Sequence, residues 1–340
     1  MSTTAAVIGC GDVSAVHFEA VAKLDGATLV AVCDADPQRL AAAVAAYGVP
    51  GFADHLSLID AVRPDVVHIC TPHDQHASLA ADCLERGVNV IVEKPLAHTL
   101  AEGRRLVEAS VEAAAAGTAK IAVCFQNRYN ATSQAMHALL QSGELGAVVG
   151  ASATVMWQRS AGYYQDRPWR GTWAGGGGGL MMNQAIHTVD LLQWLVGDVV
   201  AVTGNASTRF LGGAIEVEDT AEFVAEHANG ARSAFYATLA NAFNAPVTLD
   251  VVTEKAVLSL RGDLTVTHAD GRVDVVPERR SDSGGRSYWG VSHELLINDF
   301  YGRLDDTEPF WISPAEAEKS LAIIKDVYRQ SYPESADRVS

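Results

Sequence analysis

The chain has 340 residues, 48% of them hydrophobic and 19% charged, which is the composition of a globular protein long enough for two domains. Its formal net charge is −16 and the sequence holds no basic stretch, which argues against a nucleic-acid partner or an anionic membrane as partner. An anionic ligand would therefore have to be held by a local site, because the overall field repels it.

The first residues of the sequence and its cysteines bear on the cellular compartment of the protein. Only Met1–Thr4 precede an apolar strand, and no segment reaches about 18 uninterrupted apolar residues, so we expect a cytoplasmic protein without a membrane span. No Cys-x-x-Cys pair occurs, which favours free thiols used as small apolar residues over a thiol nucleophile or a metal site, and we expect no bound metal. The cysteines are Cys10, Cys33, Cys70, Cys83 and Cys124.

Residues 5–125 alternate short apolar runs with helical patterns. Such runs, separated by helices, are typical of parallel strands buried on both faces, and right-handed crossovers then build a doubly wound sheet. We predict an α/β protein whose first domain, residues 1–125, has a Rossmann fold. The expected strands are Ala5–Ile8, Thr28–Cys33, Val66–Cys70, Val88–Val92 and Ile121–Phe125, and the expected helices are His17–Leu24, Pro37–Tyr47, Leu56–Ala61, Gln75–Arg86 and Leu100–Ala116.

After residue 126 the strands are joined by short polar turns, which is typical of an antiparallel sheet. We predict a C-terminal α+β domain over residues 126–340, with a large, mostly antiparallel open sheet. The expected strands are Val148–Met156, Val199–Thr203, Thr220–Glu226, Arg232–Thr238, Val247–Thr253, Ala256–Leu260 and Leu264–His268, and the helices are Ile186–Val196, Glu294–Leu304 and Pro314–Tyr328. The exposed face of such a sheet is hard to solvate, so we expect a homodimer or homotetramer.

The first expected strand runs directly into a glycine-rich turn, Gly9–Ser14. Gly9 permits the tight turn and Gly11 lets the backbone approach a pyrophosphate at the N-terminus of the next helix, while Ser14 replaces the third glycine of the usual pattern. Asp34, at the end of the second strand, can accept hydrogen bonds from the adenosine ribose and repel a 2′-phosphate. The alternative is that Asp34 opens the following loop or caps its helix. The combination predicts NAD, with NADP disfavoured.

Three further segments carry a family resemblance: Thr71–His76, Glu93–Pro95 and Gly176–Asp190. Together with the glycine-rich turn they resemble the glucose–fructose oxidoreductase/inositol dehydrogenase (Gfo/Idh/MocA) family. The resemblance implies an NAD-dependent oxidoreductase acting on a secondary alcohol of a sugar, cyclitol or sugar derivative. The cofactor-binding residues implied by the turn and the resemblance are Gly9, Cys10, Gly11, Asp12, Val13, Asp34, Thr71, Pro72, His76, Glu93, Lys94 and Arg128.

Oxidation of an alcohol by hydride transfer requires a group that removes the hydroxyl proton. Lys94 follows the fourth long strand, at the carboxyl edge where open α/β sheets bind ligands, and a partly buried lysine can have a lowered pKa. The alternative is an ordinary surface lysine paired with Glu93. By analogy with the family, Lys94 binds and polarises the reacting hydroxyl.

Asn183, His187 and Asp190 lie at helical spacing, which places them on one face. Here the sequence departs from the family, which usually has aspartate at the position of Asn183. An amide cannot take up a proton, so the general acid/base role moves toward His187, with Lys94 assisting and Asn183 orienting the substrate. We therefore predict Lys94, His187 and Asn183 as the catalytic residues.

Several candidates have a structural alternative. Trp169 and Arg170 are a carbohydrate or carboxylate platform or a packed loop, and with Asp190 they form the predicted substrate-binding set. Arg128 contacts cofactor or substrate, or begins a solvated linker, and His76 lines the nicotinamide or packs inside a helix face.

Two other classes of function remain open. One is a hydrolase that uses tightly held NAD transiently to cleave a glycosidic bond, and the other is a non-catalytic sensor of dinucleotide and sugar. Net formation of NADH separates these two from a dehydrogenase.

Overall fold

The computed structural model describes residues 2–279 and 290–335, which form two compact units. The first unit comprises the described residues 2–97, 101–126 and 290–318, and the second comprises 98–100, 127–279 and 319–335. A stretch near the C-terminus thus belongs with the N-terminal residues, in addition to the predicted range 1–125. The last long helix contributes residues to both units.

Within the described ranges, the first unit holds a six-stranded parallel sheet with the order β3-β2-β1-β4-β5-β6. The predicted doubly wound sheet is confirmed. The strands are β1 (Thr3–Ile8), β2 (Ala27–Cys33), β3 (Gly51–Phe52), β4 (Val66–Ile69), β5 (Asn89–Glu93) and β6 (Ile121–Cys124). The helices are α1 (Ser14–Lys23), α2 (Pro37–Tyr47), α3 (His55–Val62), α4 (His76–Glu85), α5 (Leu100–Ala116), α10 (Gly290–Gly302) and the start of α11 (Pro314–Ser331).

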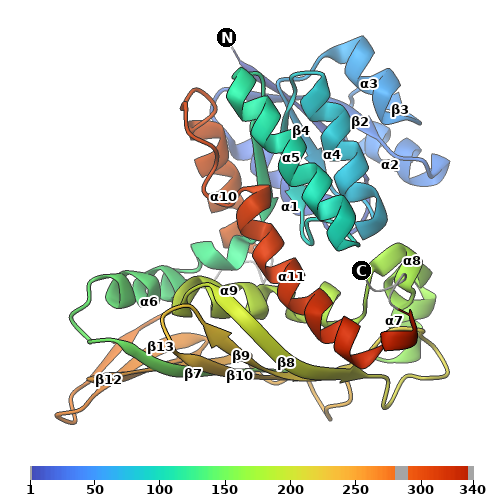
Figure 1. Cartoon of the computed structure of the whole chain (residues 1–340). Coiled ribbons are helices and arrows are strands. Elements are labelled where there is room, and N and C mark those ends of the chain that lie inside the picture. Colours follow the sequence, from blue (N-terminus) through green and yellow to red (C-terminus); the bar gives the residue numbers. More distant parts are fainter. Residues whose placement is uncertain (1, 280–289, 336–340) are drawn as a thin grey trace. The chain divides into compact units, whose positions relative to one another are not determined.

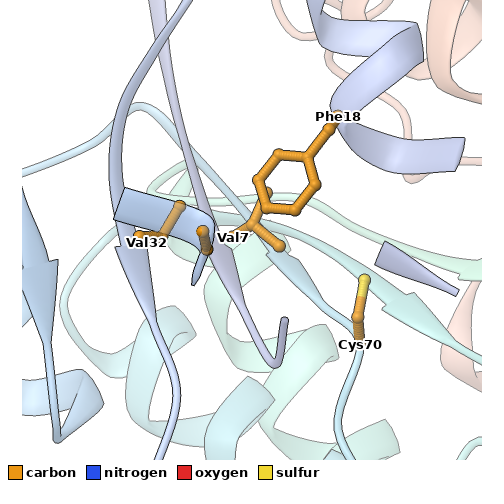
Figure 2. Packing of buried hydrophobic residues seen from close by; sticks show 5 residues of the cluster. Val7, Phe18, Val32 and Cys70 are labelled. Carbon is orange, nitrogen blue, oxygen red and sulfur yellow. The ribbon is translucent and has the colours of Figure 1, made fainter. Parts of the chain in front are cut away.

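The central strands of this sheet are covered on both faces. Every residue of β4 and β6 is buried, as the uninterrupted apolar runs predict. Figure 2 shows how α1 packs on the sheet: Phe18 lies against Val7 of β1 and Val32 of β2, with Cys70 beside them. Helix α1 also packs along α10 in Figure 1, so two segments far apart in the sequence share one layer.

Within the described ranges, the second unit holds an eight-stranded sheet with the order β14-β13-β12-β11-β7-β10-β9-β8. Neighbouring described strands are antiparallel except for the parallel pair β7–β10, so the predicted, mostly antiparallel sheet is confirmed. The strands are β7 (Val148–Met156), β8 (Val199–Ser207), β9 (Thr220–His227), β10 (Arg232–Thr238), β11 (Thr248–Thr253), β12 (Ala256–Arg261), β13 (Asp263–His268) and β14 (Val273–Val276).

Helices α6 (Ala131–Gln141) and α9 (Ile186–Val196) lie over one face of this sheet in Figure 1. Short helical segments precede α9, namely α7 (Ala161–Gln165), α8 (Trp173–Gly176) and a π-helical turn at Met181–Ala185. The other face of the sheet carries exposed apolar side chains, among them Val224, Tyr236 and Val252. The alternation of buried and exposed residues along β9 and β10 is that of a sheet with one covered face.

None of the helices in the described ranges has both the length and the apolarity that crossing a membrane would require. All five cysteines lie in these ranges and are free. Burial raises the pKa of Cys10 to about 11 and that of Cys33 to about 12, so both stay as thiols at neutral pH. These thiols behave as the small apolar residues that the sequence predicts.

Candidate functional site

The glycine-rich turn of the first unit leaves room for a ligand. Gly9 has φ +90°, and a Cβ at this position would lie 2.7 Å from the carbonyl of Cys70. A Cβ at Gly11 would meet no atom within 4 Å, so the space above this residue is open. Helix α1 begins at Ser14, whose hydroxyl donates to the Gly11 carbonyl at 2.6 Å and is buried against the sheet.

Asp34 is held in place by the backbone around it. Its Oδ2 accepts a hydrogen bond from Cys10 N at 2.8 Å, and its Oδ1 accepts one from Asp36 N at 2.8 Å. The cap of α2 is Asp36, which accepts from Gln38 N and Arg39 N. Asp34 therefore does not cap that helix, and its carboxylate links the glycine-rich turn to the end of β2.

The residues around this turn fit a dinucleotide. The open space at Gly11 and the N-terminal end of α1 offer a pyrophosphate site, and Asp34 offers acceptors for ribose hydroxyls. Thr71 Oγ1 is buried and has no hydrogen-bond partner among the residues that the structure describes. This is expected of a hydroxyl that forms its hydrogen bond with a bound ligand. The dinucleotide would be held by Gly11, Asp34 and Thr71.

Glu93 is the last residue of β5 and Lys94 follows it, and the two side chains differ in their surroundings. Lys94 is half-buried, whereas Glu93 is buried, and its Oε1 accepts from His17 Nε2 and from His293 Nε2, each at 3.1 Å. Burial alone would raise the pKa of Glu93, but the hydrogen bonds from both histidines hold it well below its usual range. Glu93 is thus an interior carboxylate.

His76 ties together the loops that follow β4 and β5. The ring is fully buried, with Nδ1 2.7 Å from the Pro95 carbonyl and Nε2 3.0 Å from the Thr71 carbonyl. These contacts fix the backbone at Thr71 and at Pro95, the residue after Lys94. They give His76 a positioning role, in line with the packing alternative for this residue.

The ligand atoms of His17, Glu93 and Cys124 lie within 4.8 Å of one another, a spacing that a metal ion could bridge. His17 and Glu93 are joined by a hydrogen bond, and burial raises the pKa of the Cys124 thiol well above its usual value. A hydrogen-bonded core explains this group, and the absence of a metal stays a prediction.

In the second unit, Asn183 and His187 are both half-buried, but they lie in different kinds of helix. Asn183 belongs to the π-helical turn, and His187 to the first turn of α9. The structure therefore differs from the regular helical spacing assumed from the sequence. π-helical turns are rare and recur at functional sites.

Asp190 and Arg128 form a buried ion pair. Arg128 Nε donates to Asp190 Oδ2 at 2.8 Å and Nη2 donates to Oδ1 at 2.6 Å, and both side chains are 1% exposed. Ser320 Oγ adds a hydrogen bond to Asp190 Oδ1 at 3.1 Å. The pair anchors α9 three residues after His187, which favours a positioning role for Arg128 and Asp190; their predicted ligand contacts stay predictions.

The glycines that precede the π-helical turn lie so close to neighbouring backbone that side chains would not fit there. Side chains at Gly177 and Gly179 would overlap the carbonyl oxygens of His98 and Glu218. The buried Glu218 carboxylate accepts from Gly179 N and Met181 N at 2.8 Å each and from the Tyr328 hydroxyl at 2.6 Å. These contacts fix the start of the π-helical turn.

Two arginines gather around Tyr163 beside the same turn. The Cζ atoms of Arg159 and Arg170 lie 5.3 and 4.7 Å from the centre of the Tyr163 ring, and we call these three residues the arginine–tyrosine cluster. Asn183 Nδ2 and Gln184 Nε2 donate to the Tyr163 hydroxyl at 3.3 and 3.2 Å. Arg170 and Trp169 were predicted from the sequence, whereas Arg159 and Tyr163 were not. The tyrosine pair before Trp169 was the one local signal that pointed to them.

Comparison with known protein families agrees with both units. A model of the oxidoreductase family with an NAD-binding Rossmann fold matches residues 3–119, and a model of the GFO/IDH/MocA C-terminal domain matches residues 133–259. The chain belongs to the GFO/IDH/MocA family. The resemblance seen in the sequence is confirmed, and the first unit of this family member is an NAD-binding Rossmann domain.

Curated relatives in this family include a D-apiose dehydrogenase from Paraburkholderia graminis, 31% identical over 67% of this chain and 58% of that protein. An inositol 2-dehydrogenase from Saccharopolyspora erythraea is 30% identical over 68% of this chain and 65% of that protein. The aligned part of this GFO/IDH/MocA chain spans about three fifths of the length of these relatives.

Among solved structures, the WlbA dehydrogenase from Bordetella pertussis, in complex with NADH and UDP-GlcNAcA, matches with a TM-score of 0.84. It is 29% identical, and the match covers 98% of each chain. A levoglucosan dehydrogenase in complex with NADH has the same TM-score at 23% identity and shares the fold.

Proposed function

We propose that this protein is an NAD-dependent oxidoreductase that transfers a hydride between nicotinamide and a secondary alcohol of a sugar, cyclitol or sugar derivative. The observation that carries the proposal is the glycine-rich turn of an NAD-binding Rossmann domain. The turn has open space at Gly11, and Asp34 accepts a hydrogen bond from its backbone at Cys10. The matched relatives are sugar and cyclitol dehydrogenases, and the WlbA dehydrogenase was solved with NADH.

When bound, the nicotinamide accepts the hydride, and this chain's residues handle the proton of the alcohol. We assign the proton to His187 and Lys94, because both are half-buried groups that can take up or release one. Asn183 orients the substrate through hydrogen bonds, since an amide cannot exchange a proton in this way. The buried Arg128–Asp190 pair keeps His187 in register by anchoring its helix.

Replacement of the two groups tests this assignment. His187→Ala should lower kcat by roughly two to four orders of magnitude, which is the usual scale for a general acid or base. Lys94→Ala should act similarly, and the losses should be less than additive if both residues serve one proton transfer. NAD affinity should change little in His187→Ala, because Gly11, Asp34 and Thr71, which would hold the dinucleotide, lie in the first unit. His268→Gln, which removes a histidine of β13 that pairs with Asp274 of β14, is the matched control.

Near wild-type turnover of His187→Ala would end this assignment of His187. Accumulation of NADH with a sugar or cyclitol supports a dehydrogenase. Cleavage of a glycoside without NADH accumulation would replace the proposal by an NAD-using hydrolase, and binding without turnover would replace it by a sensor.

We also propose that the protein assembles as a homodimer or homotetramer in the cytoplasm. The uncovered face of the second sheet, with Val224, Tyr236 and Val252 exposed, supports self-association. Five free cysteines, and none in a disulfide, agree with a reducing compartment.

A further inference from the structure

The arginine–tyrosine cluster concentrates positive charge beside the segment that carries Asn183. Both guanidinium carbons lie within 5.3 Å of one ring centre, and all three residues are half-buried. Arg159 also lies over Trp157 and Arg170 over Trp169, at 5.1 and 5.6 Å. In a chain of net charge −16, two cations stacked on one tyrosine are a local exception.

Arg159 is oriented by neutral acceptors. Its Nη1 donates to the Gln158 carbonyl at 2.7 Å and to Asn244 Oδ1 at 3.0 Å. No carboxylate within residues 2–279 or 290–335 lies within 4.0 Å of this guanidinium as an ion-pair partner. A half-buried guanidinium held rigid without a counter-charge favours an anionic ligand, because the ligand compensates the desolvated charge.

Two neutral groups next to the guanidinium groups, the Tyr163 hydroxyl and Gln184 Oε1, can each form a further hydrogen bond with a ligand. The Tyr163 hydroxyl accepts from two amides, so its own proton is available for an acceptor. Gln184 is 8% exposed, and its Oε1 is buried with no hydrogen-bond partner in the described part of the chain. The cluster thus offers a donor for an anion and, at Gln184, an acceptor for a hydroxyl.

We propose that the arginine–tyrosine cluster binds a carboxylate carried by the substrate, so that the preferred substrate is an acidic sugar or polyol. Planar guanidinium groups match a carboxylate through paired N–H donors, and Tyr163 adds a third donor. A carboxylate carries one negative charge, so the strongly acidic chain repels it less than it repels a doubly charged phosphate. The substrate class deepens the proposed oxidoreductase function, on which it rests.

Binding and turnover are measured separately with matched pairs that differ only at C6. The probes are D-glucose with D-glucuronate, D-galactose with D-galacturonate, and D-glucose 6-phosphate. Isothermal titration of the NADH-loaded enzyme gives affinity, and NADH absorbance with NAD gives turnover. We expect at least one acid to bind roughly tenfold or more tightly than its neutral partner, since hydrogen bonds to charged groups are stronger than those between neutral groups.

Arg159→Gln and Arg170→Gln should each remove most of this preference. Tyr163→Phe should weaken the acid about threefold or more, and it keeps the ring on which both arginines lie. The matched control is Arg329→Gln, which removes an exposed arginine paired with Asp326 from the same unit. This control should retain the full preference for the acid.

Equal binding of acid and neutral sugar, or no binding of either, would overturn the carboxylate site. Tighter binding of D-glucose 6-phosphate than of either acid would overturn it in favour of a phosphate site, and an equal loss in Arg329→Gln would overturn the assignment to the cluster. NADH formation from a neutral sugar alone would leave the oxidoreductase proposal standing without this one. Selective binding of an acid without formation of NADH would leave the carboxylate site standing and overturn the oxidoreductase proposal.

Discussion

The Nδ1 atoms of His17 and His68 face each other at 2.9 Å in the core of the first unit. Such a contact needs one nitrogen with a proton and one without, so the two rings hold fixed and complementary tautomers. His17 Nε2 continues to Glu93, and His68 Nε2 lies 2.9 Å from the Tyr301 hydroxyl. Both imidazoles are fully buried, and burial is the main reason why the pKa values of His17 and His68 are lowered, that of His68 well below its usual range.

The first prediction concerns acid stability. Because both histidines stay neutral in the folded protein but protonate near pH 6.5 when unfolded, the unfolded state takes up more protons as the pH falls below this value. The free energy of unfolding should therefore fall between about pH 7 and pH 5, by roughly 1–2 kcal/mol for each histidine. The pKa of Glu93 is also lowered in the folded protein. Its protonation in the unfolded state therefore reduces the free energy of unfolding only below about pH 4.5, the usual pKa of a glutamate.

Denaturation in urea at several pH values measures this slope, and NMR of the imidazole C–H groups reports His17 and His68 directly in the wild-type protein. His68→Gln should flatten the slope, whereas His55→Gln, which removes a partner of Asp82 near the surface, should retain it. Imidazole signals of His17 and His68 that titrate near pH 6.5 would contradict the prediction.

The second prediction concerns the choice of cofactor. Asp34→Ser removes the carboxylate that would repel a 2′-phosphate, and it leaves Arg39, whose Nε lies 3.9 Å from Asp34 Oδ1. The ratio of kcat/KM for NADP to that for NAD should rise roughly tenfold to a hundredfold, which corresponds to about 1.4–2.8 kcal/mol. Asp36→Ser is the control, because it changes the cap of α2 and should keep the preference for NAD. A wild-type enzyme that prefers NADP would refute the role given to Asp34.

The third prediction concerns the Arg128–Asp190 pair. Arg128→Met leaves a buried carboxylate without its partner, and this should cost about 3–5 kcal/mol of unfolding free energy. Arg329→Met breaks an exposed pair with Asp326 and should cost less than about 1 kcal/mol. Denaturant titration compares the two, and the double variant Arg128→Met/Asp190→Leu should recover part of the loss if charge burial is the cause. Equal small losses in both single variants would show that the buried pair contributes little.

The fourth prediction concerns assembly. Val224 and Ala234 face each other across β9 and β10 on the uncovered side of the sheet. Val224→Lys should convert an oligomer to a monomer, because a lysine ammonium cannot be buried there without a partner. Light scattering at micromolar concentration gives the mass, and Val111→Lys, an exposed apolar site on α5, should leave it unchanged. A monomeric wild-type protein would refute the proposed oligomer.

Much of the fold could be predicted from the sequence because the buried strands are uninterrupted runs of apolar residues. Strand β14 was missed, since Val273–Val276 is short, at the edge of the sheet and mostly exposed. Helix α6 was missed because its buried residues Thr132 and Ser133 are polar, and only Met136 adds a large apolar side chain to them, which gives little periodic signal. The helix Glu294–Leu304 was expected a few residues later than α10 is found.

The sequence predicted the glycine-rich turn at Gly9 and the position of Asp34 beside it, because a local motif specifies both. The roles of these residues and of Lys94 in binding or catalysis stay predictions. The π-helical turn at Met181–Ala185 was not predicted, because it depends on contacts of the preceding glycines with Glu218 and Tyr328, which are distant in sequence. Arg159 gains its place beside Tyr163 only through tertiary packing. A regular helix was therefore the natural assumption for Asn183, and the cluster could not be inferred.

The packing of α1 against α10 has a consequence for the order in which the chain matures on the ribosome. Lys23 bonds Glu294, which lies 271 residues later in the chain, and Glu93 bonds both His17 and His293, the latter 200 residues later. The first unit is therefore completed only when these later residues have been made. Strand β7 likewise has no neighbouring strand until β10 and β11, which lie about a hundred residues later in the chain, have been made. A nascent chain that has emerged only as far as residue 126 therefore still exposes the side of α1 that α10 will cover, and neither unit can fold completely before these later segments are made.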